Sequence, residues 1–355
     1  MAGRFYDQPF DEGTKTKLDI FELFAREWLP VFLSQSPPKW GELHLYDFFA
    51  GPGADATGQP GSPLRLLKRL AEARGYAAWP HVRIHAHFFD ADGRKIDALR
   101  ARLADPGVVP AGVEVEVEPK PFDEAFAQAQ PVLSRQNAAK LIFIDQFGVG
   151  QVGDDLFREL TRFPACDFLF FISSSTLHRF ADHPAIKQKI RRPKDYYHVH
   201  RAVVDYYRGL LPDPARYFLA PFSIKKDANI YGIVFGSGHP RGIDKFLQVA
   251  WKQDVINGEA DFDIHRDNVQ LGLFRPTKVS AFEQELEVNL TSGEIKNEQD
   301  LLMLVFRHGV KPQHAEPVLK RLKAARVIEC GFRVPQVKYY SAPRPIERPS
   351  KRSVT

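Results

Sequence analysis

Apolar runs of strand length alternate with amphipathic runs of helical spacing through the first two thirds of this 355-residue chain. The run 141–144 is wholly apolar, as expected for a strand that is covered on both faces of a parallel sheet. Regular alternation of this kind predicts a doubly wound α/β sheet with helices on both faces. The expected strands are residues 43–47, 82–90, 113–118, 141–145 and 167–173.

The next two strand-like runs break this alternation. Residues 215–226 and 229–238 are separated only by Asp227 and Ala228, which predicts a β-hairpin. An antiparallel pair that closes five parallel strands resembles the end of the sheet in class I methyltransferases. We therefore expect a Rossmann-like class I methyltransferase fold, in which a parallel sheet is closed by an antiparallel hairpin.

The C-terminal third has a different pattern. Three helical runs are followed by a strand-like run over residues 332–342, which predicts a winged helix-turn-helix domain. The last residues are rich in Pro, Arg and Ser and have no apolar face, so we expect a disordered basic tail. The expected parts are an N-terminal helical segment (1–42) packed on a methyltransferase-like domain (43–260), the winged-helix domain (261–342) and the tail (343–355).

The composition excludes several classes of protein. No apolar stretch approaches the roughly 20 residues of a membrane span, and the N-terminus lacks the apolar core of a signal peptide. We therefore expect a cytoplasmic protein without membrane association. The two cysteines, Cys166 and Cys330, are far apart and have no neighbouring His ligands, so no metal site is expected.

Asp47 ends the first strand and is followed by the glycine turn Gly51-Pro52-Gly53. Glycines let the backbone approach a ligand where a Cβ would collide, and the acid before them can accept a hydrogen bond from the ligand. A dinucleotide site would need a helix that opens within the glycine motif. Here the helix is delayed to about Ser62, and the first acid at a strand end is Asp90. This spacing favours S-adenosylmethionine over NAD.

Acidic residues also follow the second and third strands. In methyltransferases, the acid after the second strand binds the ribose hydroxyls and a later acid meets the adenine. Asp90 and Asp123 have these places, and Phe122 could stack on the base. Both acids could instead cap the helices that follow them. The candidate cofactor residues are Asp47, Gly51, Gly53, Ser62, Asp90, Phe122 and Asp123.

The fourth strand ends in Asp145-Gln146-Phe147, where amino-group methyltransferases carry Asp/Asn-Pro-Pro-aromatic. As candidate catalytic residues, Asp145 would accept a hydrogen bond from the target amine and Phe147 would hold the acceptor ring. Gln146 replaces the first proline of the motif, and the aromatic residue lies one position early. Asp145 could alternatively cap a helix or contact only the cofactor.

Two basic segments are candidates for nucleic-acid contacts. Cations interleave with aromatic residues after the fifth strand, which is the composition of a nucleic-acid groove, although a solvated helix face is the alternative. Lys320, Arg321 and Lys323 lie on the expected recognition helix of the winged domain, which could also bind protein. The candidates in the first segment are Lys187, Lys189, Arg191, Arg192, Lys194, Tyr196 and Tyr197.

The chain resembles the three-Cys-motif partner family. The matching segments are residues 17–32, 46–53 with 61–64, 143–148, 231–251 and 318–328. The resemblance implies a methyltransferase-like domain fused to a winged helix, and a partner protein with a three-cysteine motif like that of radical S-adenosylmethionine enzymes. The metal cluster would then belong to the partner. The family usually has proline after the fourth-strand Asp, and Gln146 departs from this pattern.

These observations together predict an S-adenosylmethionine-binding, methyltransferase-like protein that acts on DNA or RNA with such a partner. The alternative is a catalytically inactive nucleic-acid-binding or scaffolding subunit, which Gln146 favours. An NAD-dependent oxidoreductase is disfavoured by the hairpin and by the spacing of the acids.

Overall fold

The structure, a computed structural model, divides into two compact units. The first consists of Met1–Val249 with Ala260–His265, and the second of Ala250–Glu259 with Arg266–Thr355. The residues that the structure describes are 8–145, 153–172, 199–213, 217–226, 229–255, 258, 262–263 and 277–349.

The first unit contains a sheet with the strand order β3-β2-β1-β4-β5-β7-β6-β8. Strands β1 to β5 are parallel, and β7 is antiparallel to both β5 and β6. The predicted parallel sheet closed by an antiparallel hairpin is therefore confirmed. The strands are β1 (Glu42–Asp47), β2 (Arg83–Phe89), β3 (Val113–Glu118), β4 (Ala138–Ile144), β5 (Cys166–Ile172), β6 (Phe218–Lys226), β7 (Asn229–Ser237) and β8 (Phe262–Asp263).

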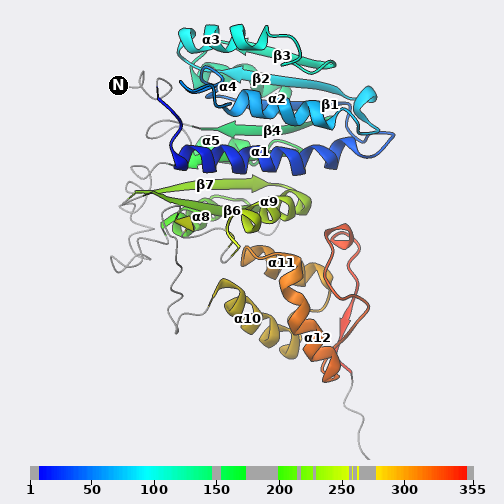
Figure 1. Cartoon of the computed structure of the whole chain (residues 1–355). Coiled ribbons are helices and arrows are strands. Elements are labelled where there is room, and N and C mark those ends of the chain that lie inside the picture. Colours follow the sequence, from blue (N-terminus) through cyan, green and yellow to red (C-terminus); the bar gives the residue numbers. More distant parts are fainter. Residues whose placement is uncertain are drawn as a thin grey trace, which may run out of the picture. The chain divides into compact units, whose positions relative to one another are not determined.

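Helices cover both faces of this sheet, as the alternating pattern requires. Figure 1 shows α1 (Glu12–Leu33) running across one face beside α2 (Ser62–Ala73), with α9 (Pro240–Gln253) near the hairpin. Trp28 of α1 donates a hydrogen bond from Nε1 to Asp167 Oδ2 on β5 at 2.7 Å, which fastens the helix to the sheet. The N-terminal helical segment thus packs on the α/β core.

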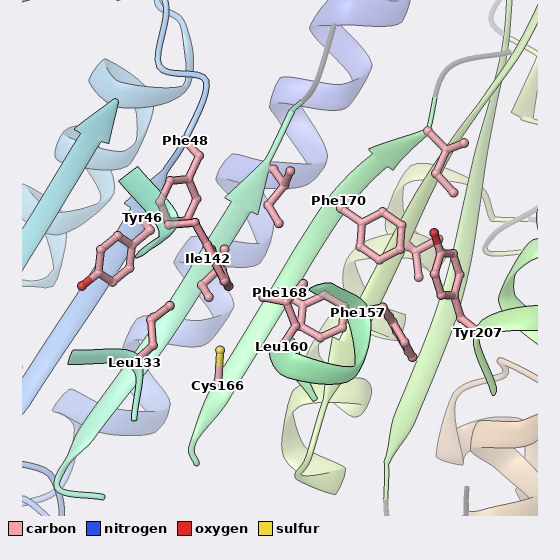
Figure 2. Packing of buried hydrophobic residues seen from close by; sticks show 14 of the residues in the cluster. Tyr46, Phe48, Leu133, Ile142, Phe157, Leu160, Cys166, Phe168, Phe170 and Tyr207 are labelled. Atoms are coloured by element: carbon pink, nitrogen blue, oxygen red, sulfur yellow. The ribbon is translucent and has the colours of Figure 1, made fainter. Parts of the chain in front are cut away.

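The other face carries a large aromatic core (Figure 2). Tyr46, Ile142, Phe168 and Phe170 project from the strands onto helices α4, α5 and α8. All seven residues of β4 are buried, which explains why its sequence shows no alternation. Each fully buried large side chain contributes about 1.5–3 kcal/mol relative to exposure, so this core anchors the strand ends that carry the site. The other helices among the described residues of this unit are α3 (Gly93–Leu103), α4 (Phe122–Leu133), α5 (Asp154–Leu160) and α8 (Val199–Gly209).

Among its described residues, the second unit contains the α-helices α10, α11 and α12 and a two-stranded antiparallel ladder. Their bounds are α10 (Lys278–Ser292), α11 (Glu298–Arg307), α12 (Glu316–Ala324), β9 (Glu329–Cys330) and β10 (Ile346–Glu347). The strand expected over 332–342 is wrong: β9 pairs with β10 instead, and Val337–Tyr339 form a 3₁₀ turn. Pro335 has no N–H for a ladder, and buried Glu298 takes the Gln336 N–H at 2.6 Å. The winged-helix assignment stays a prediction.

None of the helices in the described ranges is long and apolar enough to cross a membrane.

Candidate functional site

A pocket that is partly open to solvent lies at the carboxyl ends of β1, β4 and β5. Asp47 at the end of β1 and Asp145 directly after β4 line it together with Lys17 of α1. The strand order reverses between β1 and β4, and open α/β sheets bind ligands at such a switch point. The other lining residues are Leu18, Phe21, Ser62, Phe143, Ile144, Leu169, Phe170, Phe171 and Ile233.

Asp47 is fully buried and has one oxygen without a partner. The Phe49 N–H donates to Oδ1 at 3.0 Å, whereas Oδ2 accepts no hydrogen bond from any described residue. Burial raises the pKa of this carboxyl to about 7, with smaller contributions from the charges of Asp145 and Asp90. The nearby Ser62 hydroxyl and the hydrogen bond from the Phe49 N–H oppose the shift. A buried acceptor left unfilled is costly, so this oxygen marks a place for a ligand donor.

Asp145 is held by Lys17, a residue that the sequence interpretation did not single out. Lys17 Nζ donates to Asp145 Oδ2 at 2.5 Å and lies 4.8 Å from the centre of the Phe171 ring. Asp145 Oδ1 is buried and, like Asp47 Oδ2, has no partner in the described part of the chain. The cavity therefore presents two unfilled carboxylate oxygens from two adjacent strands.

Asp90, the acid at the end of β2, holds the glycine turn in place by accepting hydrogen bonds from backbone N–H groups. Asp90 Oδ2 accepts from the Gly51 N–H at 3.1 Å, and Oδ1 accepts from the Asp92 N–H at 2.9 Å. Gly51 and Gly53 have positive φ angles of 62° and 84°, which favour glycine. A Cβ on Gly53 would lie 2.8 Å from Leu99 Cδ1, so this turn also packs closely on α3.

Phe122 and Asp123 begin α4, and Phe122 packs against the two aromatic residues that follow Asp47. The Phe122 ring is half-buried and stacks on Phe49, two residues after Asp47, with centroids 5.6 Å apart. Asp123 is exposed in the first turn of the helix. Phe122 thus lies beside the segment that follows Asp47, while a contact of Asp123 with an adenine stays a prediction.

Asp55 is a further residue of this loop that the sequence interpretation missed. Its Oδ1 accepts from the N–H groups of Thr57 and Gln59, and its Oδ2 accepts from the Phe10 N–H at 2.7 Å. Burial opposes the charged form, but these hydrogen bonds lower the pKa of Asp55 to about 2. The carboxylate therefore shapes the loop between the glycine turn and α2 and ties it to the N-terminal segment.

Most predicted nucleic-acid residues and one catalytic candidate lie outside the described residues. These are Phe147 and the segment with Lys187, Lys189, Arg191, Arg192, Lys194, Tyr196 and Tyr197.

The three basic candidates on α12 are all exposed. Arg321 pairs with Glu287 at 2.6 Å, and Lys323 Nζ donates to the Phe332 carbonyl at 3.1 Å. Each of these two cations already has a protein partner, which reduces what α12 can offer to a phosphate.

Metal ligands are not gathered in the part of the chain that the structure describes: it contains no group of three or more His, Cys, Asp or Glu side chains placed to hold an ion.

No protein-family model matches this chain, and no curated protein matches it. Among solved structures, it is similar to the O-methyltransferase TomG from Streptomyces achromogenes in complex with SAM, with 14% identity and a TM-score of 0.34. That match covers 62% of this chain and 78% of TomG. A second similar structure is the 16S rRNA (adenine(1408)-N(1))-methyltransferase from Catenulisporales acidiphilia, with 13% identity and a TM-score of 0.27. It covers 60% of this chain and 90% of that enzyme.

Both of these proteins are methyltransferases. A likeness at these TM-scores carries no argument for this chain, so its function has to be argued from strand order and site geometry.

Proposed function

We propose that this protein binds S-adenosylmethionine at the carboxyl ends of β1 and β4 and transfers its methyl group. One observation carries the proposal: Asp47 Oδ2 and Asp145 Oδ1, both buried and both without a partner among the described residues, line one cavity beside the glycine turn. Carboxylate oxygens in this state fit a ligand with an ammonium group. S-adenosylmethionine has such a group in its amino-acid part and supplies a transferable methyl group.

The surrounding residues fit the rest of this cofactor. The glycine turn, held by Asp90, would let the backbone come close to the ligand. Asp90 accepts from the Gly51 and Asp92 N–H groups and, at 3.4 Å, from Lys95 Nζ, so a ribose hydroxyl would reach this carboxylate by taking the place of Lys95. Phe122 offers a half-buried ring at the start of α4, where the adenine would stack.

The acceptor in this proposal is a nucleic acid, and the protein works with a three-Cys-motif partner of the radical S-adenosylmethionine kind. The support for nucleic acid is the cationic and aromatic composition of residues 187–201 and the net charge of +5. Asp145 would accept a hydrogen bond from the target amine and so fix the direction of its lone pair.

A catalytically inactive nucleic-acid-binding or scaffolding subunit is the second candidate, and one contact favours it. Lys17 already occupies one oxygen of Asp145, the residue that would meet the acceptor. Gln146, in place of the proline of the amino-group methyltransferase motif, points the same way.

Calorimetry on the full chain tests cofactor binding. We expect micromolar binding of S-adenosylmethionine and S-adenosylhomocysteine and none of NAD. Asp90→Ala should weaken binding at least tenfold because it frees the glycine turn. Asp97→Ala is the matched control, since it removes an exposed acid from α3, the helix that follows Asp90. Absence of binding at millimolar ligand would overturn the proposal.

Methyl transfer separates the two candidate functions. Radiolabelled S-adenosylmethionine is incubated with the protein and with total RNA or DNA, in the presence and absence of the partner. Incorporation that Asp145→Ala abolishes, at a cofactor concentration that saturates the variant, supports the enzyme. Cofactor binding without incorporation under all these conditions supports the inactive subunit.

A further inference from the structure

Lys17 lies on the buried face of α1, where a lysine is unexpected. The same face carries Phe21, Phe24 and Trp28, all buried at helical spacing from Lys17, and Lys17 itself is only 8% exposed. A buried ammonium group is unfavourable unless a charged partner compensates it. The partner here is Asp145, which comes from a different layer of the fold and is 128 residues away in sequence.

Because of this contact, the two carboxylate oxygens of Asp145 have different surroundings. Oδ2 is taken by Lys17 at 2.5 Å, while Oδ1 stays buried and has no partner among the described residues. The two oxygens of Asp47 differ in the same way. Oδ1 accepts a hydrogen bond from the Phe49 N–H, and Oδ2 accepts none from the described residues. Each strand end therefore offers one oxygen to the same cavity.

We propose that Lys17 is a positioning residue: it holds Asp145 by Oδ2 so that Asp145 Oδ1 and Asp47 Oδ2 form a paired acceptor for one ammonium group of the ligand. This inference rests on the proposed function and names the chemistry that the cavity selects. Lys17 also compensates one of the two carboxylates, which would otherwise repel each other across the cavity. With both acids ionised, the three side chains sum to one negative charge, which matches a single cationic amine.

The charged groups around Asp47 come from several elements. Asp145 follows β4 and Lys17 lies on α1, both in the cavity. Asp90 follows β2, and Lys95 of α3 lies 3.4 Å from the Asp90 carboxylate. The repulsion from Asp145 and Asp90 contributes to the raised pKa of Asp47. Removing the cation at Lys17 should therefore make Asp47 harder to ionise.

Calorimetry with two adenosine ligands tests the inference. S-adenosylhomocysteine has the amino-acid ammonium group, whereas 5′-methylthioadenosine lacks it. We expect Lys17→Met to weaken the first at least tenfold and to change the second less than twofold, with Lys17→Arg recovering most of the affinity. The pH at which binding of S-adenosylhomocysteine reaches half its maximum should rise by about one unit in Lys17→Met. Equal losses for both ligands, or no loss for either, would overturn the inference.

A cycle of unfolding measurements without ligand keeps this test separate from the proposed function. Lys17→Met leaves Asp47 and Asp145 facing each other, so adding Asp47→Asn should recover part of the lost thermal stability. Additive effects in this cycle would overturn the inference. If the wild type binds neither adenosine ligand, the proposed function fails, and the unfolding cycle still decides the role of Lys17.

Discussion

Replacing Asp47 by asparagine should stabilise the ligand-free protein in a way that grows with pH. Burial raises the pKa of this carboxyl from its ordinary 3.8 to about 7. Between these two pH values the Asp47 carboxyl is ionised in the unfolded chain but still protonated in the native protein. The native state therefore loses stability as pH rises through this window, and the loss is complete above about pH 7.

The magnitude follows from the width of the window. Each pH unit inside it lowers the free energy of unfolding by about 1.4 kcal/mol. From about pH 5 to the native pKa the loss sums to about 3 kcal/mol. Asparagine does not titrate, so the stability of Asp47→Asn relative to the wild type should rise by about 3 kcal/mol between about pH 5 and about pH 8.

Urea unfolding at the two pH values measures this difference. The change in the stability difference with pH isolates ionisation, because the loss of hydrogen bonds to the new amide is the same at both pH values. Asp55→Asn is the matched control on the neighbouring loop. Its hydrogen bonds lower the pKa of Asp55 to about 2, so the Asp55 carboxyl is ionised in both the native and the unfolded protein throughout this pH range. Its destabilisation should not vary with pH.

A difference between Asp47→Asn and the wild type that stays constant from about pH 5 to about pH 8 would refute the reasoning. It would mean that Asp47 is solvated or already paired. The proposed function would then lose its main support, which is the absence of a hydrogen-bond partner for Asp47 Oδ2 among the described residues. A pH-dependent difference of the same size in Asp55→Asn would attribute the effect to the loop as a whole.

Three further predictions concern other parts of the chain. Burial, with the neighbouring His87, lowers the pKa of His44 to about 4. The free energy of unfolding of the wild type should therefore fall by about 3 kcal/mol as pH falls from about 6.5 to about 4, as measured by urea unfolding. The same measurement on His44→Gln should show a much smaller loss. Gly53→Ala should cost roughly 2–4 kcal/mol because of its positive φ and the contact with Leu99, whereas Gly58→Ala, with φ of 82° and open space, should cost about 1; equal costs would contradict this. Glu298→Gln breaks a buried ion pair with Arg344, so thiol labelling of Cys330 should speed up at least tenfold and that of buried Cys166 should not change.

The succession of strands along the chain and the closing hairpin could be predicted from sequence because their signals are local. The wholly apolar run of β4, the acids after the strands and the two-residue gap before Asn229 each follow from one short segment. Asp47 and Asp145 share a cavity for the same reason: parallel strands bring their carboxyl ends to one edge of a sheet. These inferences needed no knowledge of which side chains touch.

Lys17 and Glu298 could not be placed in this way because their partners come from distant segments. In the sequence, Lys17 is only a polar residue within the apolar face of a helix. Its role becomes clear only from the structure, in which α1 brings it into contact with Asp145. Glu298 is a first-turn acid of α11 by sequence, yet it captures the Gln336 N–H and the Arg344 guanidinium, and the expected wing strand is lost. A charged residue at a buried position of an amphipathic helix was the available signal in the case of Lys17.

Ligand binding and the ionisation of Asp47 should be linked, which gives the most direct test of what fills Oδ2. An ammonium donor stabilises the carboxylate and lowers its pKa, so binding releases the proton that the ligand-free protein holds. With a native pKa of about 7, the release is close to one proton at about pH 6, roughly half at pH 7 and near zero above about pH 8.5. The affinity for S-adenosylhomocysteine should therefore rise with pH through 7.

Calorimetry in phosphate and in imidazole, which both buffer in this pH range and differ in ionisation enthalpy, counts the released protons. Asp47→Asn should release none at any pH, even where residual binding is measurable. Proton uptake, or no exchange at about pH 6 in the wild type, would mean that the ligand leaves Asp47 neutral. In that case a protonated Asp47 would itself donate to an oxygen of the ligand, and the cavity would select an acceptor rather than an ammonium group.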